Sequence, residues 1–273
     1  MELFTLEPQG DGLRCQGCGR DYPVTEGIPV LLPAQPLPDL HGPEAPLLAA
    51  AGPDAAPVPH ALAQLSTYLG PGFEELAAKL RGRPKVPVAL ELGCGAGSCL
   101  FELAAGAELL VGLDRSLFLL RAAGRLAREG ELRYWRRVVG RHYQPAEMRR
   151  PKLANLELVC ADALDPPFAP GTFDRIAALN LLDNVASPRA LLHHLALLAA
   201  PRAELLISSP YAWRDGIVAE SERLGGADPA EAVRAELRAL GFRVEEEHEV
   251  PWSLRHDARA ETHYRVHFLR AVR

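Results

Sequence analysis

The residues with the clearest chemical potential form a glycine-rich turn. The apolar run 88–92, which includes Glu91, leads directly into Gly93-Cys94-Gly95-Ala96-Gly97. Glycine lets a backbone adopt left-handed conformations and approach a ligand closely, and the N-terminus of a following helix offers free N–H groups. A strand that passes through such a turn into a helix is typical of a nucleotide-binding cradle.

Polar side chains follow the next expected strands. Asp114 ends the strand expected at 109–113, Asp162 follows the strand at 156–160, and Asn180 follows the strand at 173–179. Open α/β sheets bind ligands at the carboxyl ends of their strands, so these side chains are candidates for one binding site. A carboxylate at Asp114 can accept both ribose hydroxyls of an adenosine.

The elements that must position these residues alternate between apolar strands and helices. We expect strands at 86–92, 109–113, 156–160, 173–179 and 204–208, and helices at 98–105, 117–128 and 188–199. Such alternation produces right-handed βαβ units with a parallel sheet covered on both faces. A helix at 230–240 and two strands at 242–250 and 264–272, joined by a 13-residue connection, are expected to close the sheet with an antiparallel pair. The predicted fold is α/β, a doubly wound, mostly parallel seven-stranded sheet.

Composition divides the chain into three regions. Residues 1–33 read as a small β-rich module, and residues 34–60 read as a linker rich in Pro and Ala. Residues 61–273 form the predicted main domain, which opens with two helices between 61 and 81.

Charge and hydropathy exclude several classes of function. The 273-residue chain has 48% hydrophobic residues and a formal net charge of −5, which predicts a globular protein without a general attraction for nucleic acid. No apolar run approaches the roughly 20 residues that cross a bilayer, and the first residues do not resemble a signal peptide. We therefore expect a cytoplasmic protein with no membrane partner; the oligomeric state stays open.

One segment departs from this acidic background. Residues 131–152 contain seven Lys or Arg against two Glu, a local charge of 7 − 2 = +5, with Tyr134, Trp135 and Tyr143 between them. Such a mixture is also found on RNA-binding surfaces. We interpret the segment as a solvated cover over the cleft, because the rest of the chain is acidic.

The set of motifs over residues 85–210 resembles the class I S-adenosylmethionine-dependent methyltransferases. The resemblance implies that Glu91 and the three glycines surround the methionine part of the cofactor, that Asp114 holds the ribose, and that Asp162 meets the adenine amino group. Residues near Asn180 would border the methyl donor. The full set of candidate cofactor-binding residues is Glu91, Gly93, Cys94, Gly95, Gly97, Asp114, Arg115, Asp162, Ala163 and Asn180.

A narrower resemblance lies downstream. Ser208-Ser209-Pro210-Tyr211-Ala212-Trp213, Arg223-Leu224-Gly225-Gly226 and Val250-Pro251-Trp252-Ser253-Leu254-Arg255 look like the methyltransferase domain of ovothiol biosynthesis. That domain methylates an imidazole nitrogen of a mercaptohistidine. The resemblance implies a small-molecule acceptor, a mercaptohistidine-like amino acid.

An in-line methyl transfer requires a positioned nucleophile and the exclusion of water. Tyr211 and Trp213, and also Trp252, are candidates to stack on a planar acceptor, and Arg255 is the candidate to bind its carboxylate. Asp183 or Asn184 is the candidate partner of its ammonium group. The base stays open among Asp183, Asp257, His263 and His267.

Two other functions remain open at this point. Some ribosomal RNA guanine methyltransferases also join a cysteine-rich N-terminal module to this fold, so an RNA base is an alternative acceptor. The chain is alternatively a scaffold that binds the cofactor without turnover.

The N-terminal module carries one Cys15-x-x-Cys18 pair. It looks like the second half of a small zinc-ribbon family that continues into a Tyr-Pro-Val-x-x-Gly-Ile-Pro-x-Leu segment, here residues 22–31. A structural zinc takes four ligands, usually from two such pairs, and residues 1–14 contain neither Cys nor His. We therefore expect a degenerate ribbon without a metal, packed on the main domain.

Overall fold

The computed structural model describes residues 5–32, 65, 67, 69, 72–140 and 142–273. The predicted linker and most of the first predicted helix lie outside these residues. Among the described helices, none combines the length and apolar character needed to cross a membrane.

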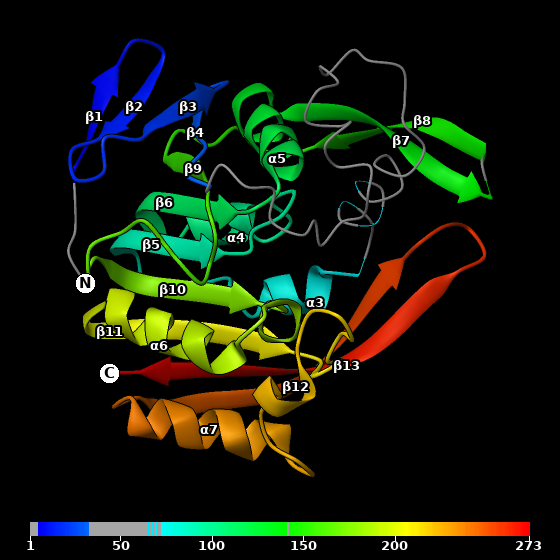
Figure 1. The fold of residues 1–273 in the computed structure, drawn as a ribbon. Helices are drawn as coiled ribbons and strands as arrows, with labels where there is room; N and C mark the ends of the chain where they lie inside the picture. Colours follow the sequence, from blue (N-terminus) through cyan, green and yellow to red (C-terminus); the bar gives the residue numbers. More distant parts are fainter. Residues whose placement is uncertain (1–4, 33–64, 66, 68, 70–71, 141) are drawn as a thin grey trace.

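A seven-stranded sheet forms the centre of the main domain, as predicted (Figure 1). Its order is β12-β13-β11-β10-β5-β6-β9. The five parallel strands are β5 (Val86–Leu92), β6 (Ala107–Asp114), β9 (Leu156–Cys160), β10 (Phe173–Leu179) and β11 (Ala199–Ser209). The antiparallel strands β12 (Arg243–Arg255) and β13 (Glu261–Val272) complete the sheet.

Helices cover both faces of the sheet. Residues of α6 (Pro188–Leu198) and α7 (Pro229–Ala239) pack in one apolar cluster, and residues of α3 (Glu74–Ala78), α4 (Leu100–Ala104) and α5 (Leu117–Glu129) pack mainly in clusters on the other face. Local signals fix the helix starts, because the side chains of Ser116, Ser187 and Asp228 accept N-cap hydrogen bonds at α5, α6 and α7. Two of these helices continue with proline at the first turn, where its missing N–H costs no helical bond.

The N-terminal module is an antiparallel sheet, and its last segment joins the main domain. Its strands are β1 (Leu6–Gln9), β2 (Gly12–Cys15), β3 (Asp21–Thr25) and β4 (Ile28–Pro29). Val30 pairs with Cys160 of β9 in parallel, and the Leu31 N–H donates to the Cys160 carbonyl over 2.8 Å. Val30 and Leu32 pack on one main-domain cluster and Leu31 on the other, so this segment continues the sheet at its β9 edge.

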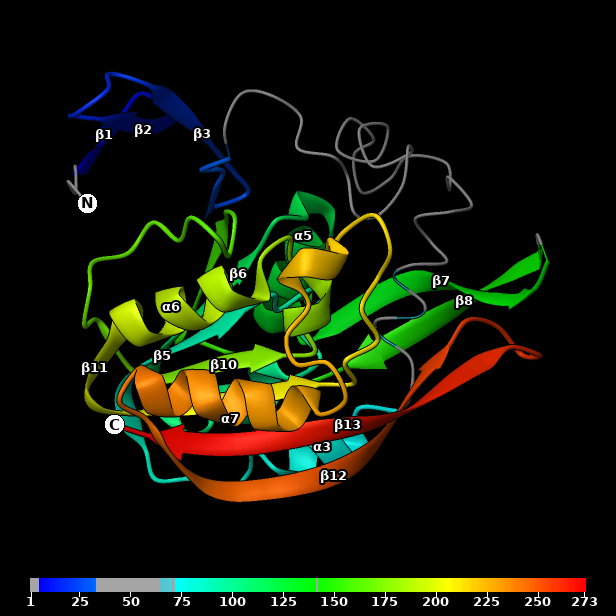
Figure 2. The same cartoon turned by 60° about the horizontal axis from the view of Figure 1, so that its bottom comes forward.

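Two β-hairpins differ from the sequence-based expectation. Residues 131–149 form an antiparallel hairpin of β7 (Glu131–Val139) and β8 (His142–Arg149), where the sequence indicated only a solvated insertion. The predicted 13-residue connection between the last two strands is wrong, because β12 and β13 run on and leave only residues 256–260 between them. Both hairpins extend past the same end of the central sheet (Figures 1 and 2).

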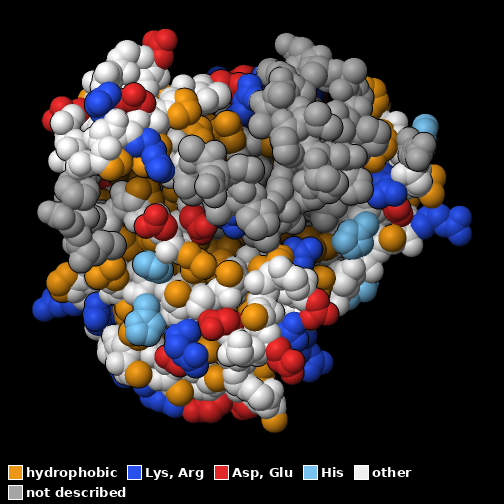
Figure 3. All heavy atoms as spheres, viewed as in Figure 1, with side chains coloured by type: hydrophobic (Ala, Val, Ile, Leu, Met, Phe, Trp, Pro, Cys, Tyr) orange, Lys and Arg blue, Asp and Glu red, His pale blue; other side chains and the backbone are white. Residues whose placement is uncertain are grey.

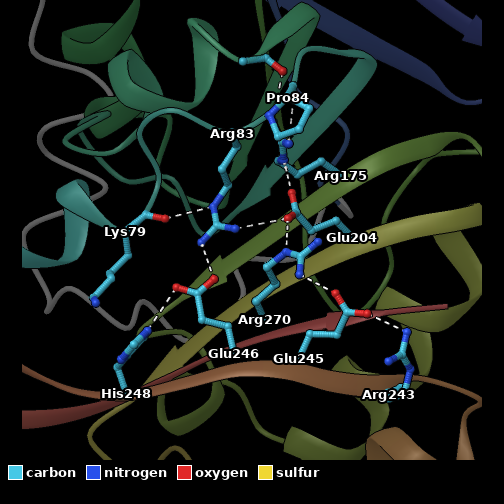
Figure 4. A network of polar contacts seen from close by, with 11 residues as sticks. Lys79, Arg83, Pro84, Arg175, Glu204, Arg243, Glu245, Glu246, His248 and Arg270 are labelled. Carbon is cyan, nitrogen blue, oxygen red and sulfur yellow. Dashed lines mark hydrogen bonds and ion pairs between the residues drawn. The ribbon is translucent and has the colours of Figure 1, made fainter.

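A buried ion cluster ties the opposite end of the sheet together (Figure 4). Glu204 on β11 accepts hydrogen bonds from Arg175 of β10, from Arg270 of β13 and, over 3.2 Å, from Arg83. Arg83 also donates to Glu246 of β12 over 3.2 Å. Burial alone would raise the pKa of Glu204, but the hydrogen bonds from Arg270 and Arg175 outweigh it and lower that pKa.

Candidate functional site

The glycine turn follows the carboxyl end of β5. Gly93, Gly95 and Gly97 have φ values of 72°, 55° and 87°, all in the left-handed region that favours glycine. A Cβ on Gly93 would lie 2.7 Å from the Leu181 Cδ1 atom. The turn therefore needs glycine both for its backbone conformation and for its close approach to the segment after β10.

Asp114 lies against this turn, as the sequence motif predicts. Its Oδ2 accepts the Gly95 N–H over 2.8 Å, and its Oδ1 accepts the Ser116 N–H over 2.8 Å. Asp114 is the last residue of β6, which is the strand next to β5. The sheet thus brings the acid and the glycine turn together from positions 19 residues apart.

Glu91 is buried beneath the turn and has an unsatisfied oxygen. The residue is 3% exposed, and its Oε2 has no hydrogen-bond partner among the residues that the structure describes. Burial, with a smaller effect from the Asp114 charge, raises the pKa of Glu91 to about 8. At neutral pH the side chain is therefore mostly a neutral carboxylic acid with spare hydrogen-bonding capacity.

Asn180 offers a second unsatisfied group after the neighbouring strand. Its φ is 52°, its Oδ1 accepts the Ser208 hydroxyl over 2.9 Å, and its carbonyl accepts from the Asn184 amide over 2.9 Å. These contacts fix the side chain, yet its buried Nδ2 has no partner within the described part of the chain. Buried polar groups are normally hydrogen-bonded. The free atoms of Glu91 and Asn180 therefore fit a polar ligand held over the glycine turn.

Asp162 and Arg115 follow the strands farther toward the β9 edge. Arg115 Nε lies 3.9 Å from Asp162 Oδ2, and Asp162 Oδ1 accepts the Leu164 N–H over 2.9 Å. The Ala161 N–H donates to the Asp114 carbonyl over 3.1 Å, which places Asp162 next to the Asp114 strand end. Ala163 and Cys94, also candidates from the sequence, are buried at this level.

Three of the four predicted catalytic residues belong to one connected group. Asp183 is 3% exposed, its Oδ1 accepts the Ser209 hydroxyl over 3.1 Å, and burial raises its pKa. The Tyr211 N–H donates to the same Ser209 hydroxyl over 3.0 Å, and the Tyr211 and Trp213 ring centroids are 5.9 Å apart. Asp183, Tyr211 and Trp213 are thus linked after the ends of β10 and β11.

Arg255, the fourth, lies elsewhere. It ends β12 toward the tip of the β12–β13 hairpin, where its side chain is half exposed and lies 3.7 Å from Glu261 across the hairpin. Trp252 packs between Phe73 and Tyr264, with ring centroids 5.7 and 4.9 Å away. These two residues are therefore not in the group formed by Asp183, Tyr211 and Trp213.

The structure adds two serines that had no predicted role, and it brings one of the candidate bases to Tyr211. Ser208 and Ser209 end β11 and fix Asn180 and Asp183 respectively. His267, one of four candidates for the base, is 4% exposed and its Nδ1 lies 2.6 Å from the Tyr211 hydroxyl. Two hydroxyl residues in succession at the end of an apolar strand were a usable sequence signal, because a core strand seldom continues with polar side chains.

The two hairpins meet beside this end of the sheet. The Ala258 N–H donates to the Val138 carbonyl over 2.9 Å. In the register of β7 and β8, Arg133 lies opposite Glu147 and Trp135 lies opposite Pro145. Trp135 is 39% exposed. Basic side chains are visible at this end of the molecule in Figure 3.

Comparisons with known proteins agree with the glycine turn and the strand order. Residues 90–207 match the family model of a methyltransferase domain. No curated protein matches the chain.

Several solved structures are similar to this chain. A Haloferax volcanii complex that contains the Trm112 methyltransferase activator includes a chain with 18% identity and a TM-score of 0.52, over 74% of this chain and 89% of that chain. An S-adenosylmethionine-dependent methyltransferase from Aquifex aeolicus is 18% identical with a TM-score of 0.48, over 80% and 99% of the two chains. The [4+2]-cyclase SpnF is 19% identical with a TM-score of 0.46, over 69% of this chain and 60% of its own length.

The glycine turn against Asp114 and the unsatisfied Glu91 and Asn180 atoms are consistent with the matched domain. When bound, S-adenosylmethionine supplies the electrophilic methyl group, and the side chains that would hold it are Glu91, Asp114, Asp162 and Asn180. Residues 90–207 thus match a methyltransferase domain, and this match implies S-adenosylmethionine as the cofactor.

Proposed function

We propose that the protein methylates a small molecule, an imidazole nitrogen of a mercaptohistidine-like amino acid. The observation that carries this proposal is the attachment of the segment 209–214 to the cofactor edge. Ser209 donates to Asp183 over 3.1 Å, and Arg214 donates to Asn184 over 3.0 Å. The residues that resemble the ovothiol-type domain thus lie next to those that resemble the general methyltransferase site.

The chemistry of this group suits a flat amino acid. Tyr211 and Trp213 offer aromatic faces for an imidazole, and aromatic faces also favour a cationic sulfonium. Asp183 offers a buried carboxyl group that can hold a proton or pair with an ammonium group. Arg255, on the hairpin that extends past this end of the sheet, remains the proposed partner of the acceptor carboxylate.

Methyl transfer tests the proposal directly. We expect labelled methyl from S-adenosylmethionine to appear on mercaptohistidine and not on histidine incubated in parallel. Asp114→Ala should lose both this transfer and the binding of S-adenosylhomocysteine in calorimetry, because the carboxylate that faces the glycine turn is removed. Binding that is unchanged in Asp114→Ala would contradict the assignment of the cofactor site.

An RNA base is the second candidate acceptor, and the outer side of β7–β8 favours it. Arg133 and Arg149 have side chains that are 81% and 73% exposed, and Trp135 lies between charged positions on the same strand pair. Filter binding to total RNA over a series of salt concentrations separates the two acceptors. A steep loss of binding with salt supports RNA, because phosphate contacts release counterions. Label that appears only in RNA would overturn the small-molecule proposal.

We also propose that the N-terminal module supports the methyltransferase domain as part of the same chain. The Haloferax structure contains a separate methyltransferase activator. Here the module pairs with edge strand β9 through Leu31 and Cys160, two residues before Asp162. The Cys160 thiol also lies 3.5 Å from the Arg115 carbonyl. Cys160, which the module contacts, is therefore close to both Arg115 and Asp162.

A further inference from the structure

The segment after β11 is held in an unusual conformation. Tyr211 has a φ of 52°, a left-handed value that is uncommon for a bulky aromatic residue. Such conformations persist only where the surroundings hold them, and they concentrate at functional sites. The Ser209 hydroxyl accepts the Tyr211 N–H over 3.0 Å and so holds the backbone side of this residue.

The hydroxyl of Tyr211 is held by a partly buried chain of hydrogen bonds. The Tyr211 hydroxyl lies 2.6 Å from His267 Nδ1, and His267 Nε2 lies 2.7 Å from Glu247 Oε1. The His267 side chain is 5% exposed. Glu247 also forms an ion pair with Arg234, so the chain reaches from the loop through β13 and β12 to α7.

Glu247, at one end of this chain, indicates the direction of its hydrogen bonds. Burial alone would raise the pKa of Glu247, but hydrogen bonds from His267 and Arg234 outweigh it and lower that pKa. A carboxylate only accepts hydrogen bonds, so His267 donates from Nε2; in the neutral imidazole, Nδ1 is then the acceptor. With that tautomer, the Tyr211 hydroxyl donates to His267 Nδ1, and the Tyr211 oxygen keeps lone pairs for a further donor.

We propose that His267 and Glu247 are positioning residues for the methyl acceptor. By accepting the Tyr211 hydroxyl, His267 fixes the ring of Tyr211, and through the ring contact it also fixes Trp213. Glu247 holds His267 in the tautomer that this contact requires. The proposal rests on the proposed function, since the acceptor is taken to be the imidazole of a mercaptohistidine. Neither residue acts on the acceptor directly.

The kinetic test compares three variants that break the chain at different points. In Tyr211→Phe, His267→Phe and Glu247→Ala, we expect KM for mercaptohistidine to rise by about five- to tenfold, as for one lost hydrogen bond. We expect kcat to change by less than about twofold, because the loss affects acceptor binding. The Kd of S-adenosylhomocysteine should stay unchanged in all three variants.

A double variant and a matched control complete this test. Tyr211→Phe combined with His267→Phe should raise KM no more than the larger single effect, because the two groups act as one unit. His248→Phe makes the same substitution on the neighbouring strand, where His248 contacts Glu246 over 3.1 Å and stacks on Phe268. It should leave KM unchanged. Additive effects, or an unchanged KM in Tyr211→Phe, would overturn the proposal.

A second readout does not depend on the acceptor. In a Trp135→Phe/Trp252→Phe background, acrylamide quenching reports the exposure of Trp213. Tyr211→Phe, which is the mildest of the changes to the fold, should increase that quenching, and His248→Phe should not. If the wild-type protein transfers no methyl to mercaptohistidine while this quenching pattern holds, the acceptor is wrong and the positioning role stands. Unchanged quenching in Tyr211→Phe overturns the positioning role.

Discussion

Among single residues, Glu91 links cofactor binding to proton binding. With a pKa raised to about 8 by burial, its side chain is mostly protonated in the free protein at pH 7. The resemblance to class I methyltransferases places the methionine part of the cofactor, which carries an ammonium group, beside this residue. A nearby cation favours the carboxylate and lowers its pKa.

We therefore predict that S-adenosylhomocysteine binding at pH 7 releases close to one proton, about 0.9 from the titration of a single group. The measurement is calorimetry in two buffers with different ionisation enthalpies. Glu91→Gln is the matched control and should bind with the same enthalpy in both buffers. A buffer-independent enthalpy in the wild-type protein would show that Glu91 does not change its charge.

The same residue predicts the pH dependence of stability. Between the ordinary carboxyl pKa of about 4.3 and the folded value of about 8, only the unfolded chain releases the Glu91 proton. The free energy of unfolding contributed by this group therefore falls as pH rises through that window, by about 1.4 kcal/mol for each tenfold drop in proton concentration. Urea denaturation at several pH values between 5 and 8 measures this fall. Glu91→Gln should flatten the slope, and an identical slope in the variant would contradict the raised pKa.

Among the elements, the edge pairing of the N-terminal module makes a separate prediction. Leu31→Pro removes the N–H that donates to Cys160, with an expected cost of about 1 kcal/mol in docking. Leu31→Ala keeps the N–H and controls for the lost side chain. Hydrogen exchange at β4 and β9 should accelerate more in Leu31→Pro than in Leu31→Ala. If the module supports the adenine side, the Kd for S-adenosylhomocysteine should rise in the same order. Equal Kd values in the two variants would show that docking of the module does not affect cofactor binding.

For the whole molecule, the ion cluster around Glu204 dominates the end of the sheet opposite the glycine turn. Glu204 accepts from arginines on three different segments. Its loss removes the counter-charge of the buried Arg175, whereas Arg83 and Arg270 keep ion pairs with Glu246 and Glu245. We expect Glu204→Gln to reduce the free energy of unfolding by about 3–5 kcal/mol, the usual effect of breaking a buried ion pair. Arg243→Gln, at a side chain that is 77% exposed, is the control and should cost less than about 0.5 kcal/mol.

Because the folded pKa of Glu204 is lowered, its stabilisation is present above the unfolded carboxyl pKa and is lost as pH falls through the folded value. Acid denaturation of the wild-type protein should therefore show a steeper loss of stability than that of Glu204→Gln. Parallel acid transitions would show that other carboxyl groups control this loss.

Much of the fold was predictable because its signals are local. The apolar runs at 86–92, 156–160 and 173–179 correspond to β5, β9 and β10 residue for residue. The β7–β8 hairpin was not found, since its inward positions, such as Leu132 and Met148, alternate with charged residues that mask the apolar pattern.

Site residues were predictable where they directly follow a single strand. They were not predictable where strands far apart in the sequence bring them together. His263 and His267 lie on the same side of β13, so periodicity could not separate them. The sheet pairing distinguishes the two histidines, because β11 pairs with β13 only from His267 onward and His263 lies beyond that pairing. The place of Arg255 could not be predicted for a related reason, since its position along a long hairpin depends on where the turn falls.

Residues 30–32, which lie beside β9, also affect the tendency of the protein to aggregate. An unpaired sheet edge is a template for strands from other molecules. Val30 and Leu31 pair with the Cys160 end of the β9 edge. On β12, every second residue from 243 to 249 is charged, namely Arg243, Glu245, Glu247 and Glu249. Concentrated solutions of the wild-type chain should therefore resist fibril growth, and thioflavin fluorescence should appear first in variants that release the β9 edge.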